Sequence, residues 1–214
     1  MQLYTYFRSS SAYRVRIALN LKGLEAEHHF VHLLKDGGEQ HKPAYQNINP
    51  QGRVPVLIDQ GLRLTQSLAI IEYLEEIHPR PPLLPDAPED RARVRALAQA
   101  IACEIQPLNN LQVLKYLVDD LKASEEQKLD WYRHWITKGF AALEKMLADD
   151  PRTGGFCHQN TPGLADVCLV PQVYNAVRFE CDLSEFPLIR AINDACLALK
   201  EFQEATPENQ PDAV

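Results

Sequence analysis

Apolar positions in the first quarter of the chain change their spacing at a run of serines. Residues 3–7 form a short apolar stretch, and apolar residues then recur at helical spacing from Val15 to Leu19. The pattern predicts a strand from Leu3 to Phe7 and a helix from Ser11 to Leu21, ended by Lys22-Gly23. The serines therefore lie where a strand gives way to a helix.

Further apolar segments continue this mixed order up to residue 80. They predict strands near Glu27 to His32, at Val56 to Asp59 and at Leu62 to Leu64, with a turn at Asp59-Gln60-Gly61 between the last two. A helix is expected from Ser67 to His78. A βαβ unit followed by a hairpin and a helix is typical of a thioredoxin-like domain.

Prolines divide the chain between His78 and Glu89, where fixed φ angles and missing N–H groups prevent a continuous helix. We expect a linker there, between a thioredoxin-like domain at residues 1–80 and a second domain at 89–214. Apolar residues of this second half recur at three and four positions, which predicts an all-α domain. The expected helices lie near 97–108, 129–147, 164–177 with a kink at Pro171, and 188–199, whereas Ala205 to Val214 is expected to lack regular structure.

Composition narrows the function classes. The chain has 214 residues, 45% hydrophobic residues and a net charge of −7, which indicates a globular protein and argues against nucleic acid or anionic membrane as a partner. The N-terminus lacks a signal-peptide core and no run of about 18 apolar residues is present, so we expect a cytoplasmic protein. The five cysteines form no C-x-x-C pair, and we expect no bound metal.

Three short motifs suit recognition of an anionic, cysteine-containing peptide. Ser9, Ser10 and Ser11 begin a helix, where N–H groups and the helix dipole favour a thiolate; the alternative is an ordinary serine cap. Val54-Pro55 precedes a strand, where a cis peptide could turn the Val54 backbone outward to pair with an extended peptide. Gln66-Ser67 opens the next helix and suits capture of a carboxylate.

With these motifs the chain resembles the zeta class of the cytosolic glutathione transferases over nearly its whole length. The resemblance is carried by segments in both halves of the chain: Arg8 to Leu19, Lys35-Asp36-Gly37-Gly38, Asn49-Pro50, Val54-Pro55, Gln66 to Glu76, Ile105 to Leu111, Leu164 to Val173 and Asn175 to Phe179. It implies the glutathione transferase fold, a thioredoxin-like N-terminal domain and an all-helical C-terminal domain.

Two positions depart from the class pattern. The class has Ser-Ser-Cys-Ser where this chain has Ser9-Ser10-Ser11-Ala12, so Ser11 replaces the cysteine and excludes a covalent role for it. Gly163 stands three residues before Asp166, where the fold usually has a serine or threonine in a capping box. We expect the glycine to cost a little stability and to have no functional meaning.

The resemblance also implies a reaction and its residues. It implies glutathione-dependent cis–trans isomerisation of a small dicarboxylate, maleylacetoacetate, with glutathione as a cofactor that is not consumed and a homodimeric enzyme. Ser9, Ser10 and Ser11 are the candidates for thiol activation, with Ser10 and Ser11 favoured for binding. The other implied contacts are Val54, Pro55, Gln66 and Ser67 to glutathione, and Arg8, Gln106, Asn109 and Arg178 to the substrate. Arg14 and Arg16 are expected to be structural, paired with acidic groups or solvated.

Other activities remain open at this point. One is isomerisation of the shorter maleylpyruvate, whose bacterial enzymes tend to have histidine at the place of Gln106, so Gln106 favours maleylacetoacetate. Another is a glutathione transferase that conjugates or dehalogenates α-halo acids, which would consume glutathione. The last is a binding protein without catalysis, suggested by the replaced cysteine.

Overall fold

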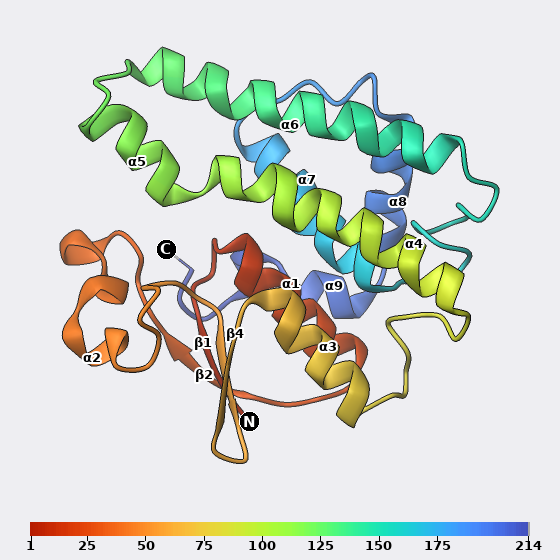
Figure 1. Ribbon diagram of the computed structural model, residues 1–214, viewed down its shortest axis with the longest axis horizontal. Coiled ribbons are helices and arrows are strands. Elements are labelled where there is room, and N and C mark those ends of the chain that lie inside the picture. The colour runs from red at the N-terminus through yellow and green to blue at the C-terminus, as the bar shows by residue number, and fades with distance from the viewer. Residues whose placement is uncertain (214) are drawn as a thin grey trace. The chain divides into compact units, whose positions relative to one another are not determined.

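The computed structural model describes residues 1–213, which fall into two compact units (Figure 1). The first unit joins Met1–Leu83 to the C-terminal segment that begins at Ala198, and the second comprises Leu84–Leu197. The boundary at Leu83 lies within the proline-rich stretch. These units differ from the predicted domain ranges of 1–80 and 89–214 at the end of the chain, where the residues from Ala198 pack with the first unit.

A four-stranded mixed sheet forms the centre of the first unit. Its strands are β1 (Gln2–Thr5), β2 (Glu27–Phe30), β3 (Val56–Asp59) and β4 (Leu62–Thr65), in the spatial order β2-β1-β3-β4. β1 pairs parallel to β2 and antiparallel to β3, and β3 pairs antiparallel to β4. Helices α1 (Ser10–Leu21) and α3 (Ser67–Ile77) lie side by side next to the sheet, and the short α2 (Pro43–Gln46) lies apart from them (Figure 1). The predicted thioredoxin-like order is confirmed.

Strand β1 ends two residues earlier than the apolar pattern predicts. Tyr6 and Phe7 are buried like strand residues, but the Tyr6 carbonyl accepts the Ser9 N–H at 3.0 Å. The Phe7 carbonyl accepts an N–H of the Arg16 guanidinium at 3.0 Å. Since these carbonyls bond within the turn and to a side chain, the two residues leave the sheet and lead into α1.

Two arginines of α1 belong to the interior of the first unit, which agrees with the structural role expected of them and excludes the alternative that they are solvated. Arg14 and Arg16 are each 2% exposed. Arg14 donates to the hydroxyl of Ser67, and Arg16 donates to the Thr5 hydroxyl and to backbone carbonyls. A buried guanidinium is tolerated where its donors are bonded, and for Arg16 the Thr5 hydroxyl and backbone carbonyls serve that purpose.

A buried ion pair closes the end of the first unit next to the proline-rich stretch. Lys22 Nζ lies 2.6 Å from Glu75 Oε2 and also donates to the carbonyls of His78 and Pro81. The Glu75 carboxylate in turn accepts the Leu83 N–H. The ends of α1 and α3 are thereby joined to the chain that leaves this unit.

The C-terminal segment is ordered on the first unit. Helix α9 (Lys200–Ala205) packs against α1, and a 3₁₀ turn follows at Pro207–Asn209. Pro207 and Gln210 are buried, and the Gln210 amide donates to the carbonyls of Glu204 and Thr206. The expected lack of regular structure is confirmed for Thr206 and residues 210–213, but Ala205 ends α9 and Pro207–Asn209 form a 3₁₀ turn. The buried side chains and hydrogen bonds hold this segment on the first unit.

The second unit is helical throughout its regular structure. Its helices are α4 (Pro88–Gln99), α5 (Leu111–Asp119), α6 (Glu125–Ala148), α7 (Leu164–Arg178) and α8 (Pro187–Leu197). α7 is its most buried helix, lies against α4 and α8, and runs through Pro171. The expected helix at 97–108 is not uniform: a π-helical stretch at Ala100–Ile105 and a 3₁₀ turn at Gln106–Asn109 continue α4. Pro107 has no N–H group to donate and so removes one hydrogen bond from the helical ladder at this point.

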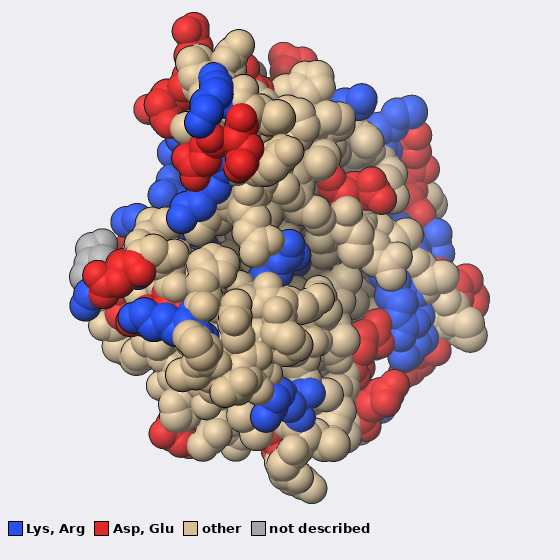
Figure 2. All heavy atoms as spheres, turned by 60° about the vertical axis from the view of Figure 1, so that its left-hand side comes forward, with Lys and Arg blue, Asp and Glu red and all other residues tan. Residues whose placement is uncertain are grey.

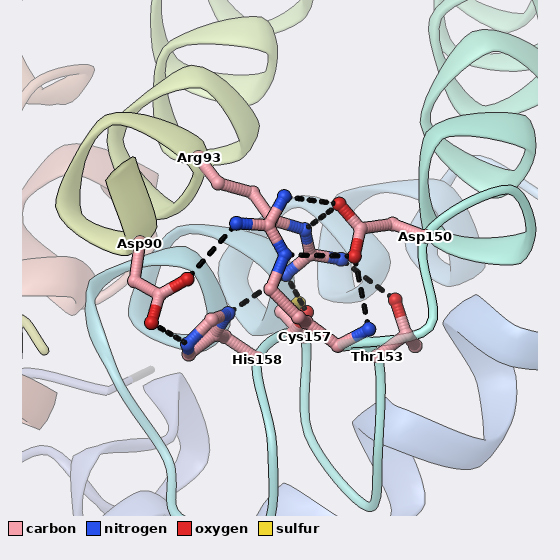
Figure 3. A network of polar contacts seen from close by, with 7 residues as sticks. Asp90, Arg93, Asp150, Thr153, Cys157 and His158 are labelled. Carbon is pink, nitrogen blue, oxygen red and sulfur yellow. Dashed lines mark hydrogen bonds and ion pairs between the residues drawn. The ribbon is translucent and has the colours of Figure 1, made fainter. Parts of the chain in front are cut away.

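A network of charged side chains holds the start of α4 to the loop after α6 (Figure 3). The Arg93 side chain is 8% exposed and donates to Asp150, Thr153 and the carbonyl of Cys157. Arg152 binds Asp150 and, at 2.9 Å, Asp90. These bonds lower the pKa of Asp150 below its ordinary value of 3.8, against the opposing effect of burial. The network fixes a loop that has no regular structure of its own.

Candidate functional site

The N-terminus of α1 carries the three predicted serines. Ser9 is the N-cap, and its Oγ accepts the Ala12 N–H at 3.2 Å. Ser10 and Ser11 are the first two helical residues, and all three serines are half-buried. No acidic residue occupies the first turn of α1. The prediction of hydroxyls at a helix start is confirmed, and the positive end of this helix has no carboxylate of its own to balance it.

Ser9 differs from its two neighbours in already having a structural role. Its lone pair serves the Ala12 N–H, as in an ordinary N-cap. A hydroxyl still has its own hydrogen to donate, so capping does not prevent a bond to an anion. The capping and anion-binding interpretations of the motif are therefore compatible at this residue.

Arg8 adds a positive charge at the same turn. Its guanidinium carbon lies 4.7 Å from the centre of the Phe7 ring, and the residue is half-buried. A guanidinium on an aromatic face is oriented but keeps its donors available for a carboxylate. The chain thus places a cation beside the serines, as the sequence predicts.

The segment before β3 presents the Val54 backbone beyond the paired part of the sheet. The Val54-Pro55 peptide is cis, as expected, and pairing of β3 with β1 begins only at Val56. The carbonyl of Arg53 accepts the Tyr45 hydroxyl and the Asn49 amide, each at 2.7 Å. These two bonds fix the backbone of the residue that precedes Val54.

Gln66 and Ser67 begin α3 in an arrangement that the sequence only partly predicts. Gln66 has φ of 68°, unusual for a residue other than glycine, and its amide donates to Gln51 at 3.0 Å. Ser67 is 5% exposed, and Arg14 Nη1 lies 3.3 Å from its Oγ. The first turn of α3 contains no acidic residue. Arg14 is a site component that sequence reasoning missed, because its distance of 53 positions from Ser67 leaves no local signal.

Two of the predicted residues of the second unit, Asn109 and Arg178, contact the members of an aromatic pair. Tyr132 and Phe179 stack with their ring centres 3.8 Å apart. Asn109 is 7% exposed and donates to the Tyr132 carbonyl at 3.1 Å, and the exposed Arg178 lies 5.0 Å from the Phe179 ring. Burial raises the pKa of Tyr132, whereas the charge of Arg178 acts in the opposite direction. Gln106 is half-buried at the start of the 3₁₀ turn.

The structure also describes the cysteines, possible metal clusters and surface charges of the chain. All five cysteines are free thiols, and Cys157, Cys168 and Cys196 are buried. Within residues 1–213 no cluster of histidine, cysteine and acidic side chains is arranged to hold a metal ion. No helix in that range combines the length and hydropathy needed to cross a membrane. On the face drawn in Figure 2, basic and acidic side chains are interspersed.

Comparisons with known proteins agree with this geometry. Residues 3–82 match the N-terminal domain of glutathione S-transferases. A probable maleylacetoacetate isomerase of Vibrio cholerae is 53% identical over 211 residues, which are 99% of this chain and 97% of that protein.

Two solved structures cover all of this chain and are covered entirely by it. One is the holo structure of a maleylpyruvate isomerase, a bacterial zeta-class glutathione S-transferase, with a TM-score of 0.97 and 47% identity. The other is a maleylacetoacetate isomerase of Methylobacterium extorquens with bound malonate and glutathione, with a TM-score of 0.96 and 41% identity. The chain is 53% identical to one relative and 47% identical to a zeta-class structure over nearly its whole length, and it has a serine-bearing helix start on a thioredoxin-like sheet. The chain therefore belongs to the zeta class of glutathione transferases.

Proposed function

We propose that this protein isomerises maleylacetoacetate to fumarylacetoacetate, with glutathione as a recycled cofactor. The observation that carries the proposal is the start of α1, where three hydroxyls and Arg8 meet a helix end that contains no carboxylate. Enzymes named for this isomerisation are about half identical to the chain over nearly its full length. The same arrangement supports maleylpyruvate as a second substrate, since a protein named for that activity is 48% identical.

The residues of the first unit fit glutathione at both ends of its peptide. Ser10, Ser11 and the N-terminal end of α1 would hold its thiol as the thiolate. The Val54 backbone, held beside cis Pro55, would pair with its cysteinyl residue. Gln66 and Ser67, at a helix start without an acid, would bind the carboxylate of its γ-glutamyl group.

Bound glutathione supplies a thiolate that adds reversibly to the cis double bond, so that a single bond exists long enough to rotate. The chain's own task is to stabilise negative charge throughout. Arg8 would bind a substrate carboxylate, and its position in the sequence next to Ser9, with its guanidinium over the Phe7 ring, supports this role. Arg178, Gln106 and Asn109 are assigned to the substrate on the resemblance. The contacts of Asn109 with Tyr132 and of Arg178 with Phe179 support a contact surface in the second unit.

The assay must separate isomerisation from conjugation and from binding alone. Purified protein is given maleylacetoacetate or maleylpyruvate with catalytic glutathione, and free thiol is followed throughout. We expect loss of the cis isomer at constant thiol, faster with maleylacetoacetate. Thiol loss with α-halo acids and no isomerisation would instead indicate a transferase, and glutathione binding without turnover would indicate a binding protein.

Serine variants test the assignment within the site. Ser10→Ala and Ser11→Ala are each expected to lower kcat/KM about tenfold, because one hydrogen bond to a charged group is worth about 1.5 kcal/mol or more. Ser9→Ala is expected to lower the free energy of unfolding by about 1 kcal/mol in addition to any loss of activity, since it removes the N-cap of α1. Activity equal to that of the parent protein in all three variants would show that these hydroxyls have no part in the mechanism.

The assembly and location of the protein follow the same family. We propose a homodimer, in which the first domain of one subunit contacts the helical domain of the other, and a cytoplasmic location. The five free thiols support a reducing compartment. Light scattering of the purified protein at several concentrations tests the dimer, and a monomer at all of them would contradict it.

A further inference from the structure

The C-terminal segment reaches the residue that precedes the serine turn. Asp212 Oδ2 accepts the backbone N–H of Phe7 at 3.0 Å, across 205 positions of sequence. Phe7 is 3% exposed and stands directly before Arg8 and the N-cap Ser9. A carboxylate at the far end of the chain is therefore one peptide unit away from the turn that begins α1.

Arg16 holds the same peptide from the other side. Its Nη2 donates to the Phe7 carbonyl at 3.0 Å, and its Nη1 donates to the Tyr6 carbonyl at 3.4 Å. Its Nε and Nη2 also donate to the Ala205 carbonyl of the C-terminal segment, at 3.2 and 3.1 Å. The C-terminal segment thus touches the turn twice, directly through Asp212 and indirectly through Arg16.

The sheet does not fix this part of the chain. Pairing of β1 ends at Thr5 with β2 and at Tyr4 with β3, so Phe7 lies beyond both ladders. Both polar groups of the Phe7 backbone are instead bound to side chains, the N–H to Asp212 and the C=O to Arg16. The position of the turn consequently depends on these two charged groups, whose opposite charges also attract each other.

We infer that Asp212 is a positioning residue for the thiolate site, acting through the Phe7 backbone. By holding Phe7 it fixes where Ser10, Ser11 and the N–H groups of α1 point. A displacement of about 1 Å in such a site costs up to about a hundredfold in rate. The inference rests on the proposed function for its catalytic consequence, but the contact itself can be tested without any substrate.

Three variants separate positioning from folding. Asp212→Ala removes the acceptor, Asp212→Asn keeps an oxygen of the same shape, and Glu204→Ala removes an exposed carboxylate of the same segment as a matched control. Kinetics and the pH midpoint of the bound glutathione thiolate, followed by its ultraviolet absorbance, are measured on folded protein. Hydrogen exchange of peptides spanning Tyr6 to Ala12 is measured without ligand.

Asp212→Ala is expected to lower kcat/KM about tenfold, to raise the pH midpoint of the thiolate and to speed exchange in the turn. Asp212→Asn is expected to recover activity to within about threefold of the parent protein, because its amide oxygen still accepts the Phe7 N–H. Glu204→Ala is expected to match the parent protein in every measurement.

An Asp212→Ala protein with unchanged exchange in the turn and an unchanged thiolate midpoint would overturn the inference, whatever its melting temperature. If the parent protein neither binds glutathione nor isomerises, the proposed function fails, and the exchange measurement alone then decides whether Asp212 holds the turn. A variant that loses activity only in proportion to its unfolded fraction would show a merely structural role.

Discussion

The helices of the two units differ in whether acidic side chains lie at their N-termini. In the second unit α4 has Glu89 and Asp90 in its first turn, and α6 has a capping box from Ser124 and Gln127 with acidic residues beside it. At the start of α7 the two oxygens of Asp166 accept the N–H groups of Cys157 and Gly163, each at 2.8 Å. These helix starts have acids supplied by the local sequence.

The start of α8 also has an acid, but this acid comes from a residue that is distant in the sequence. Its first turn contains no acid, but the Glu144 carboxylate of α6 accepts the N–H groups of Leu188 and Ile189 at 2.7 and 3.0 Å. Helix α5 has the neutral cap Asn110 instead. Carboxylates therefore serve four of the five helices of the second unit.

The two long helices of the first unit have no such carboxylate in their first turns. Serines begin both of them, and basic side chains lie nearby: Arg8 beside the start of α1, and Arg14 on the hydroxyl of Ser67 at the start of α3. The chain has a net charge of −7, yet no acid neutralises the positive end of the helix dipole within these first turns. Such a helix start favours binding of an external anion. The comparison shows that acids lie at most helix starts of the second unit, whereas the first turns of α1 and α3 contain none. Under the proposed function, these two helix starts would bind an anionic ligand.

Asp166→Ala should have the largest effect on this comparison. The change leaves the buried N–H groups of Cys157 and Gly163 without their acceptor, which we expect to cost about 3 kcal/mol of unfolding free energy. Urea unfolding measures the loss, and Asp130→Ala, an exposed acid on α6, is the control. Thiolate formation in the folded fraction should stay unchanged, and a changed thiolate pKa would show that the two units are not independent in this respect.

Placing an acid at the start of α1 should have the next largest effect. Ser11→Asp offers a carboxylate to the same N–H groups, so we expect unchanged or slightly higher thermal stability but a loss of glutathione affinity of about tenfold to a hundredfold. Ser11→Asn, similar in shape and neutral, is the matched control and should lose much less. Undiminished glutathione binding by the Ser11→Asp protein would refute the idea that this helix start is reserved for an anion.

Asp150→Asn tests an acid that serves arginines of the second unit. We expect a cost of about 1 to 2 kcal/mol at neutral pH, because Arg93 and Arg152 lose a charged acceptor. The pKa of Asp150 lies below its ordinary value of 3.8, so its contribution is present above about pH 4 and is lost as the pH falls through the lower folded value.

The difference between the parent protein and Asp150→Asn should therefore shrink in urea unfolding at strongly acidic pH. Asp149→Asn is the control, since Asp149 forms only an exposed pair with Lys145 and should change stability by a few tenths of a kcal/mol. A pH-independent difference for Asp150→Asn would contradict the assignment of its stabilising effect to the ionised carboxylate.

Gly163→Ser should produce the smallest effect. Gly163 caps α7 with extended backbone angles, and its N–H already donates to Asp166. A serine hydroxyl there could accept the Asp166 N–H and complete the capping box, raising the unfolding free energy by about 0.5 kcal/mol without a change in activity. A loss of stability would show that the glycine is required for a reason other than capping.

Local patterns were enough for the regular elements that bury one face. The period of α6 and the serine-led starts of α1 and α3 follow from residues within a few positions of each other. Helix α9 and the packing of the C-terminal segment were not predicted, because the few apolar residues of this segment show no helical period. Its order comes from α1, which lies almost 200 positions earlier in the chain.

The sequence by itself determined the family, through its resemblance in both halves of the chain, and it determined the order of the strands and of helices α1 and α3 in the first unit. It also determined the serines at the start of α1, since these features depend on short-range spacing and backbone geometry. Only the tertiary structure decided that Arg16 is buried, that Arg14 binds Ser67 and that Asp212 holds Phe7. A charged side chain can be buried only where distant parts of the chain bring acceptors or donors to it, and no local pattern records where those partners will meet.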